Sequence, residues 1–418
     1  MKRFVLLILL LAMALSMTGC LTVTGGNDQP DDIPPEEQHL TADVDETEVW
    51  HRRHDDVWSG QDEPELVSRD FERISGAAAN GMTVGQELLL LDFMDCYYQS
   101  IGQLRVIDPA DLFAEPKEVA YHKTIWHDLC VIRKLSPIDL TMTSYSYALR
   151  CESITPSEET EGDVDMVLRE SNVTYFAGLN GIPSEQFGIK HTFTLRGVGD
   201  RWLIVRHWSD DNAYYSADYD EETQQDRNFP AITDYIQARR ELPRDEQVSA
   251  TAAHPYDRAA ARQYMLSYVG KRNGDFKAYD DYGGNCMNFG SQVLLSGGIP
   301  MDTSGGYETG WYWYSASQTT LPWVNVGWFL EYAAAEREHG LVAVVNAPYF
   351  TGETGDIITM GVEEAANHTT VILDTIKDEN GAVVDYLLCS NTADLRNFPA
   401  SAYYYTNRQL TKIIGWND

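Results

Sequence analysis

Residues 282–292 read Tyr-Gly-Gly-Asn-Cys-Met-Asn-Phe-Gly-Ser-Gln, and this stretch determines how the C-terminal part of the chain is interpreted. The two glycines interrupt the preceding structure, and Phe289 and Val293 then recur at helical spacing. The pattern predicts a loop that leads directly into a helix, with Cys286 at or near its first turn. Unpaired backbone N–H groups and the positive dipole end of a helix favour a thiolate there. Such a cysteine is either a nucleophile or a buried residue that only packs.

A nucleophilic cysteine needs a base, and the base needs a group that orients it. Downstream, His368 stands at the beginning of a β-branched stretch, residues 368–374, that is typical of a strand. The next predicted strand, residues 383–390, ends at Asn391. A cysteine on a helix, a histidine at the start of a strand and a polar residue after the next strand follow the papain order. A histidine satisfied by the backbone at a strand end is the alternative for His368.

Several ordered motifs then carry a family resemblance. They are residues 283–292 with 297–301, the helix opening at 255–260, the aromatic segments 311–312 and 323–326, the strand entry 355–358, and His368. Together, residues 254–418 resemble the putative amidase domain family of bacterial surface proteins, which is papain-like and similar to NlpC-type cell-wall peptidases. The resemblance implies a papain-like domain of the α+β class, with Cys286 as nucleophile and His368 as base.

Two positions depart from the family pattern. The residue before the cysteine is usually Asp in this family, and here it is Asn285. The third polar position is often a His followed by Thr, whereas here it is Asn391 followed by Thr392. An Asn carbonyl can orient a neutral imidazole, so Asn391 remains the predicted third catalytic residue. Asn288 and Gln292 are expected to be structural, and the chemistry requires no metal and no cofactor.

The predicted activity is amide hydrolysis by an exported cysteine amidase or peptidase, with peptidoglycan or another peptide as substrate. In this scheme Cys286 attacks the carbonyl, His368 moves the proton, and the Cys286 backbone N–H stabilises the oxyanion. The alternative is a non-catalytic surface lipoprotein whose papain-like domain binds a wall component or a protein partner. Asn285 keeps that alternative open.

Residues 1–20 have the composition of a targeting segment. Lys2 and Arg3 precede an apolar run at residues 4–15, and small residues lead to Cys20. This resembles a bacterial lipobox, in which the cysteine receives diacylglycerol. The sequence therefore predicts an extracytoplasmic protein anchored to the cell membrane by lipid at Cys20. An uncleaved anchor or an ordinary signal peptide would also lead to export.

Residues 21–83 are predicted to be an acidic, disordered tether, because residues 21–50 in particular are polar, acidic and interrupted by prolines. The whole chain has 31 Lys and Arg against 64 Asp and Glu, a formal net charge of −33. An excess of negative charge argues against nucleic-acid binding. It does not indicate an oligomeric state.

Residues 84–215 follow a different plan. The periodicity predicts helices at 86–103 and 115–135, then strands at 139–154, 164–177, 189–195 and 201–208. Helices followed by a curved antiparallel sheet indicate a smaller α+β domain whose element order is similar to the nuclear transport factor 2-like fold. No acid–base group stands out, so we expect a binding or spacer role. Residues 216–253 are predicted to be a connector with one helix at 232–241.

The remaining cysteines, Cys96, Cys130, Cys151 and Cys389, show no CxxC spacing. Free buried cysteines are favoured over a disulfide among the first three. Aromatic residues are dense between residues 307 and 328. We expect most of them to pack a core, and part of them to be able to line a substrate cleft.

Overall fold

The computed structural model describes residues 66–71, 73–361, 367–405 and 407–418. The described residues all belong to one compact unit. The predicted signal segment, including Cys20, and residues 21–65 of the predicted tether lie outside the described residues. Within the part that is described, no helix is long and apolar enough to cross a membrane.

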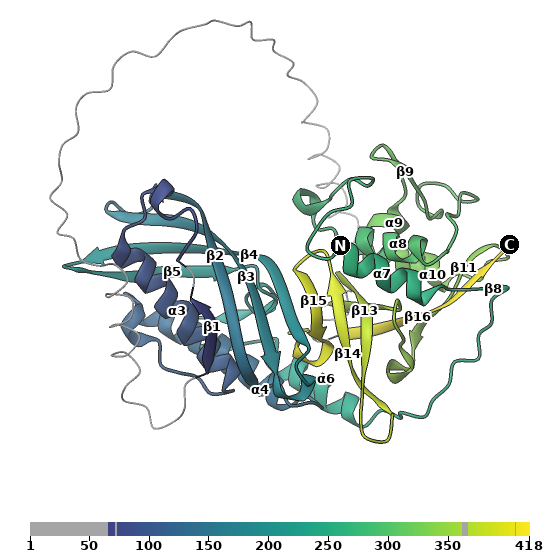
Figure 1. Cartoon of the computed structure of the whole chain (residues 1–418), viewed down its shortest axis with the longest axis horizontal. Coiled ribbons are helices and arrows are strands. Elements are labelled where there is room, and N and C mark those ends of the chain that lie inside the picture. Colours follow the sequence, from purple (N-terminus) through teal and green to yellow (C-terminus); the bar gives the residue numbers. More distant parts are fainter. Residues whose placement is uncertain (1–65, 72, 362–366, 406) are drawn as a thin grey trace, which may run out of the picture. The chain divides into compact units, whose positions relative to one another are not determined.

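The predicted order of helices followed by strands is confirmed in the middle part of the chain (Figure 1). The main elements are β1 (Val67–Phe71), α3 (Val84–Gly102), α4 (Pro116–Lys134), β2 (Met142–Pro156), β3 (Asp163–Phe176), β4 (Pro183–Val198), β5 (Arg201–Ser209), α5 (Asn212–Ser216) and α6 (Phe229–Arg240). Strands β2 to β5 pair antiparallel in sequence order. Short 3-10 turns and the two-residue strands β6 (Tyr219–Asp220) and β7 (Gln225–Asp226) complete this part.

Local sequence explains where the two long helices begin. The Thr83 hydroxyl accepts a hydrogen bond from the Gln86 backbone N–H, and the Gln86 side-chain oxygen accepts one from the Thr83 backbone N–H, a capping box that starts α3. Pro116 occupies the first turn of α4, where its missing N–H costs nothing. Phe93 of α3 contacts the rings of Trp126 of α4 and Phe193 of β4, and all three side chains are almost fully buried, so the helices and the sheet share one core.

The ordered structure begins earlier than expected. Strand β1 pairs parallel with β2, with Val67 opposite Ser144, and the Leu66 backbone N–H donates to Gln99 Oε1 at 2.9 Å. The predicted tether at 21–83 is therefore too long at its C-terminal end. The acidic composition of this segment predicts no strand, because β1 obtains its hydrogen bonds from β2, which lies far along the chain.

The C-terminal part is also α+β. Its helices are α7 (Arg258–Tyr268), α8 (Cys286–Ser296), α9 (Leu321–Val324) and α10 (Val326–Ala334), and its main strands are β11 (Gly340–Ala347), β12 (Ile357–Gly361), β13 (His368–Lys377), β14 (Val383–Ser390), β15 (Asp394–Pro399) and β16 (Asn407–Asn417). The strand order is β15-β14-β13-β12-β16-β11, antiparallel throughout. Phe289 and Val293 of α8 are buried in a core with Val371 and Cys389 from the sheet.

The two parts share one sheet. Strand β15 pairs antiparallel with the first half of β4, and this pairing joins twelve of the described strands in one sheet. This is possible because β4 is longer than predicted: Glu185–Phe187 pairs with β15, whereas His191–Val198 pairs with β5. An ion pair between Arg396 and Glu185 supports the junction.

Candidate active site

The loop before α8 brings its first turn against the sheet. Gly283 and Gly284 have φ angles of +98° and +117°, a region that favours glycine. A Cβ on Gly284 would also lie 3.2 Å from the Thr392 hydroxyl oxygen. The Asn285 backbone N–H donates to that same hydroxyl. Cys286 therefore begins α8 beside the residues that follow β14.

The side chain of Asn285 is a fixed part of this turn. Its Oδ1 accepts hydrogen bonds from the Tyr279 backbone N–H at 3.2 Å and from Asn288 Nδ2 at 2.8 Å. Asn288 Oδ1 in turn accepts from Trp323 Nε1 at 2.9 Å, and Gln292 accepts from the Tyr264 hydroxyl at 2.6 Å. Since both partners of Asn285 Oδ1 are donors, a carboxylate oxygen would accept the same bonds. The replacement of Asp by Asn therefore leaves this turn intact.

His368 is the first residue of β13 and pairs with Met360 of β12. Its side chain is buried, and its Nε2 lies 3.5 Å from the Tyr403 hydroxyl. The rings of Tyr403 and Tyr405 lie at centroid distances of 5.9 and 6.1 Å from the imidazole. Burial lowers the pKa of His368 from 6.5 to about 4. The imidazole is therefore neutral at pH 7.

The Cys286 thiol is also buried, and two opposing effects act on its pKa. Burial raises the pKa and is the larger effect, whereas the backbone N–H groups of Thr369, Met287 and Cys286 lower it. The helix start alone favours a thiolate, but the enclosed position reverses that expectation. The Thr369 backbone N–H bonds to the Cys286 sulfur, and Thr369 directly follows His368. The start of β13 and the start of α8 therefore lie together at this sulfur.

Cys286 and His368 line one cavity of about 390 Å³. The residues around it are Asp210, Asn212, Tyr215, Asp280, Gly283, Gly284, Asn367, Thr392, Ala393, Tyr403 and Tyr405. Cys286 and His368 are predicted from the sequence, whereas the two tyrosines Tyr403 and Tyr405 and the three residues of the middle part are not. The run of tyrosines at 403–405 was the available signal for the two tyrosines. No local pattern marked Asp210, Asn212 or Tyr215.

Asn391 does not occupy its predicted place. It is buried, and its Nδ2 donates to the backbone carbonyls of Tyr268 at 3.1 Å and Lys271 at 2.8 Å, after the end of α7. Among the described residues, no hydrogen bond joins Asn391 to His368, and Asn391 is not part of the cavity wall. Its neighbour Thr392 faces the cavity instead. Asn391 therefore fixes the loop after α7, and Tyr403 is the hydrogen-bond partner of His368.

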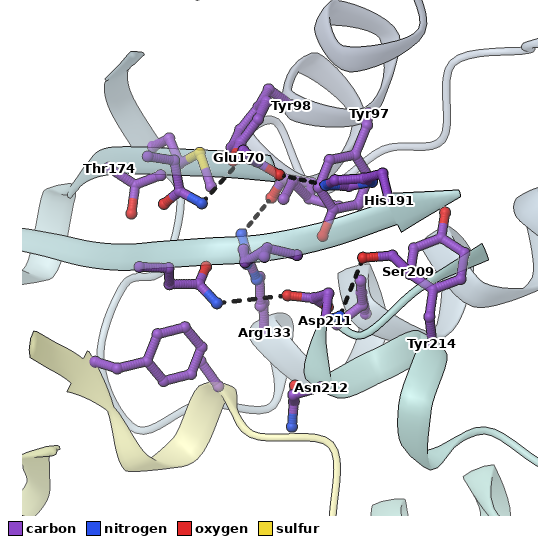
Figure 2. A pocket seen from close by; sticks show the side chains of 18 of the residues that line it. Tyr97, Tyr98, Arg133, Glu170, Thr174, His191, Ser209, Asp211, Asn212 and Tyr214 are labelled. Atoms are coloured by element: carbon purple, nitrogen blue, oxygen red, sulfur yellow. Dashed lines mark hydrogen bonds and ion pairs between the residues drawn. The ribbon is translucent and has the colours of Figure 1, made fainter. Parts of the chain in front are cut away.

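A second, much smaller cavity lies in the middle part (Figure 2). Its volume of about 20 Å³ is roughly that needed for one water. His191 bridges Glu170 Oε2 at 2.8 Å and His207 Nε2 at 3.0 Å, and Asn172 Nδ2 donates to the other Glu170 oxygen at 3.0 Å. Burial lowers the pKa of His207 well below its usual value. In the described part of the chain, no group of His, Cys, Asp and Glu side chains has the arrangement of a metal site.

The other predicted features have simple structural roles. Trp311 and Trp323 are fully buried, whereas Tyr307 and Tyr314 are exposed, so the aromatic segment mainly packs the core. The five described cysteines are free and buried. The interpretation of Cys96, Cys130 and Cys151 as free residues is therefore confirmed.

Comparison with known proteins finds a family match in the C-terminal part of the chain. Residues 255–414 match the family model described as a putative amidase domain. A segment of 145 residues is 32% identical to the uncharacterized protein YhbB of Bacillus subtilis (strain 168), covering 34% of this chain and 43% of that protein. The match thus spans less than half of the relative's length. No solved structure gives a significant match. The family match supports an amidase domain in the C-terminal part and, with it, an amidase-like hydrolase function.

Proposed function

We propose that this chain is an exported cysteine amidase or peptidase that hydrolyses an amide bond in cell-wall peptide. One observation carries the proposal: the Cys286 thiol at the start of α8 and the imidazole of His368 at the start of β13 line the same cavity. The match of residues 255–414 to an amidase family supports the reaction class. The predicted lipid anchor at Cys20 supports the location and, with it, the choice of substrate.

The chemistry starts from a neutral pair. When a substrate carbonyl reaches the sulfur, His368 takes the thiol proton and the sulfur lone pair forms a bond to the carbonyl carbon. The backbone N–H groups of Cys286 and Met287 have no partner within the helix and donate to the oxyanion. His368 then gives the proton to the leaving amine as the C–N bond breaks, and water hydrolyses the thioester.

Burial has a definite role in this mechanism. Before a substrate binds, the low pKa of His368 makes its imidazole a weak base, and burial makes the Cys286 thiol a weak acid. Charge separation is then favourable only when the developing oxyanion meets the N–H groups at the helix start. The Tyr403 hydroxyl, 3.5 Å from Nε2, is placed to orient the imidazole in place of Asn391.

The same burial also favours the competing function. A thiol with a raised pKa and a histidine that, among the described residues, bonds to no carboxylate or amide fit a domain that binds wall peptide without cleaving it. In that case the cavity would hold a peptide and release it unchanged.

Incubation of residues 21–418 with defined muropeptides, followed by mass spectrometry, separates the two functions. We expect cleavage products with the wild type and none with Cys286→Ala. Intact muropeptides with both proteins, together with equal binding, would establish the binding function instead. Cys20→Ser tests the location separately, because it should release the protein from the membrane fraction. Unchanged fractionation without an N-terminal mass shift would refute the anchor.

A further inference from the structure

The wall of the Cys286 cavity includes a segment from outside the amidase match. Asp210, Asn212 and Tyr215 follow β5 in the middle part, whereas the family match begins at residue 255. Pairing of β15 with β4 fixes the two parts against each other at this point, through Asp394 opposite Phe187. The cavity is therefore built by both parts of the chain, and the middle part has a position from which to contact a substrate.

Asn212 has an unused hydrogen-bond donor at this wall. Its side chain is more than nine-tenths buried, with 7% exposure, and its Nδ2 has no hydrogen-bond partner. A buried donor without a partner is costly, and native structures contain few of them. Asn212 lines both the Cys286 cavity and the smaller cavity of Figure 2, and an acceptor on a molecule that fills the Cys286 cavity would satisfy this donor.

The cavity continues into an acidic groove. A neighbouring hollow of about 310 Å³ shares Asp210, Asp280, Gly284, Thr392 and Ala393 with it. Five aspartates and two arginines line this hollow: Asp210, Asp211, Asp280, Asp281, Asp394, Arg169 and Arg272. Arg272 pairs with both Asp280 and Asp394, so it does not offset the other carboxylates.

Asp210 is the carboxylate best placed to meet a substrate. It lines both hollows, and its side chain is 40% exposed. One of its oxygens accepts from the Lys190 backbone N–H at 2.7 Å, which fixes the carboxylate in place. The other oxygen is 3.9 Å from Arg169, a loose ion pair that leaves it accessible.

We propose that Asp210 and Asn212 form a substrate subsite for a peptide that carries a free ammonium group. Asp210 accepts from the ammonium, and Asn212 Nδ2 donates to a carbonyl of the same peptide. The subsite places the peptide bond at Cys286, and in this respect the inference rests on the proposed function. Binding itself is independent of catalysis and is tested separately.

Calorimetric titration of the Cys286→Ala chain with three model peptides tests the subsite. The peptides are tetra-alanine amide with a free α-amine, its N-acetylated form, and N-acetyl-Ala-Lys-Ala-Ala amide, which has only a side-chain ammonium. We expect Asp210→Asn to weaken the preferred ammonium peptide about fivefold and the uncharged peptide not at all, as for a partly exposed ion pair. Asn212→Ala should weaken all three about tenfold through its lost hydrogen bond.

The controls make the result specific. Asp200→Asn changes an exposed aspartate in the turn between β4 and β5 and should have no effect on affinity. Asn212→Leu keeps roughly the side-chain size and removes the donor without adding a charge, so it serves if the alanine variant does not fold. The α-amine and lysine peptides identify which ammonium is recognised.

The outcomes separate this inference from the proposed activity. If the ammonium preference and its loss in Asp210→Asn are found but the wild type cleaves no peptide, the subsite stands and the amidase function fails. If acetylation has no effect and Asp210→Asn and Asn212→Leu behave like Asp200→Asn, the subsite is overturned. Absence of binding by all three peptides overturns it as well.

Discussion

Buried histidines line two cavities of this protein, and the neighbours of these histidines differ between the two. In the middle part, His191 contacts Glu170 and His207 in a space that holds about one water, 20 Å³. At the Cys286 site, the hydrogen-bond partner of His368 among the described residues is the Tyr403 hydroxyl at 3.5 Å, and the imidazole borders a cavity of about 390 Å³. Hydrogen bonds to Glu170 and His207 fix both ring nitrogens of His191, so this cluster contributes to the fold. In the proposed function, His368 instead interacts with a substrate in its cavity.

The largest expected effect separates the two histidine sites by activity. His368→Ala should lower kcat/KM for peptide hydrolysis by about 10³-fold, because it removes the proposed general base and acid. His191→Ala should leave the activity per folded molecule unchanged, because His191 does not line the Cys286 cavity. Steady-state kinetics on protein quantified for its folded fraction measures both. Equal losses in the two variants would contradict this division of roles.

A smaller effect separates them by stability. Glu170 is buried and bonds to Tyr98, Asn172 and His191, so Glu170→Ala leaves three polar partners unsatisfied. We expect a loss of about 3 kcal/mol in the free energy of unfolding, measured by urea denaturation. Glu159→Ala is the matched control, because Glu159 forms an exposed ion pair with Arg206 and should cost less than about 0.5 kcal/mol. Similar costs for the two would show that Glu170 is not a structural centre.

The lowered pKa of His368 gives a pH dependence with a defined sign. The unfolded chain binds a proton near pH 6.5, but the folded protein binds it only near a pKa of about 4. Stability therefore falls as pH drops below about 6.5, and His368 accounts for about 2 kcal/mol between pH 7 and pH 5. Urea unfolding at both pH values should show a smaller difference in His368→Gln than in the wild type. An unchanged difference would mean that His368 is accessible to protons in the fold.

The smallest effect concerns Asn391. Its amide donates to two carbonyls at 3.1 and 2.8 Å, so Asn391→Ala should cost about 1–2 kcal/mol of stability. Because Asn391 does not contact His368, the pH profile of kcat/KM should keep its midpoints. Tyr403→Phe removes the hydroxyl near Nε2 and is the comparison variant, since it should shift the acid limb. A shift in Asn391→Ala alone would restore Asn391 to the predicted catalytic role.

The positions of Cys286 and His368 could be predicted from the sequence, because each depends on the backbone pattern of its own segment. The glycines at 283–284 and the helical recurrence of Phe289 and Val293 placed Cys286 at the first residue of α8. β-Branched residues after His368 placed the histidine at the first residue of β13. The helices and strands of residues 84–215 were also found, since their periods of about 3.6 and 2 residues are properties of the chain itself.

Other features of the site depended on contacts between distant residues. The sequence predicts that Asn391 faces His368. In the structure its side-chain amide instead donates to two backbone carbonyls at and just after the end of α7, and these bonds set its direction. The thiolate expected at Cys286 is opposed by burial, and no local pattern reports desolvation. Tyr403, Tyr405 and Asp210 reach the cavity through segments that pair or pack far along the chain.

The sequence by itself determined the class of elements, the position of the cysteine and histidine at the ends of those elements, and the resemblance to an amidase family. Only the tertiary structure decided that β15 extends the sheet of the middle part and that Asp210 and Asn212 form a wall of the cavity. The physical reason is the range of the interactions. Backbone periodicity acts over a few residues, whereas strand pairing, burial and the direction of a polar side chain depend on the whole fold.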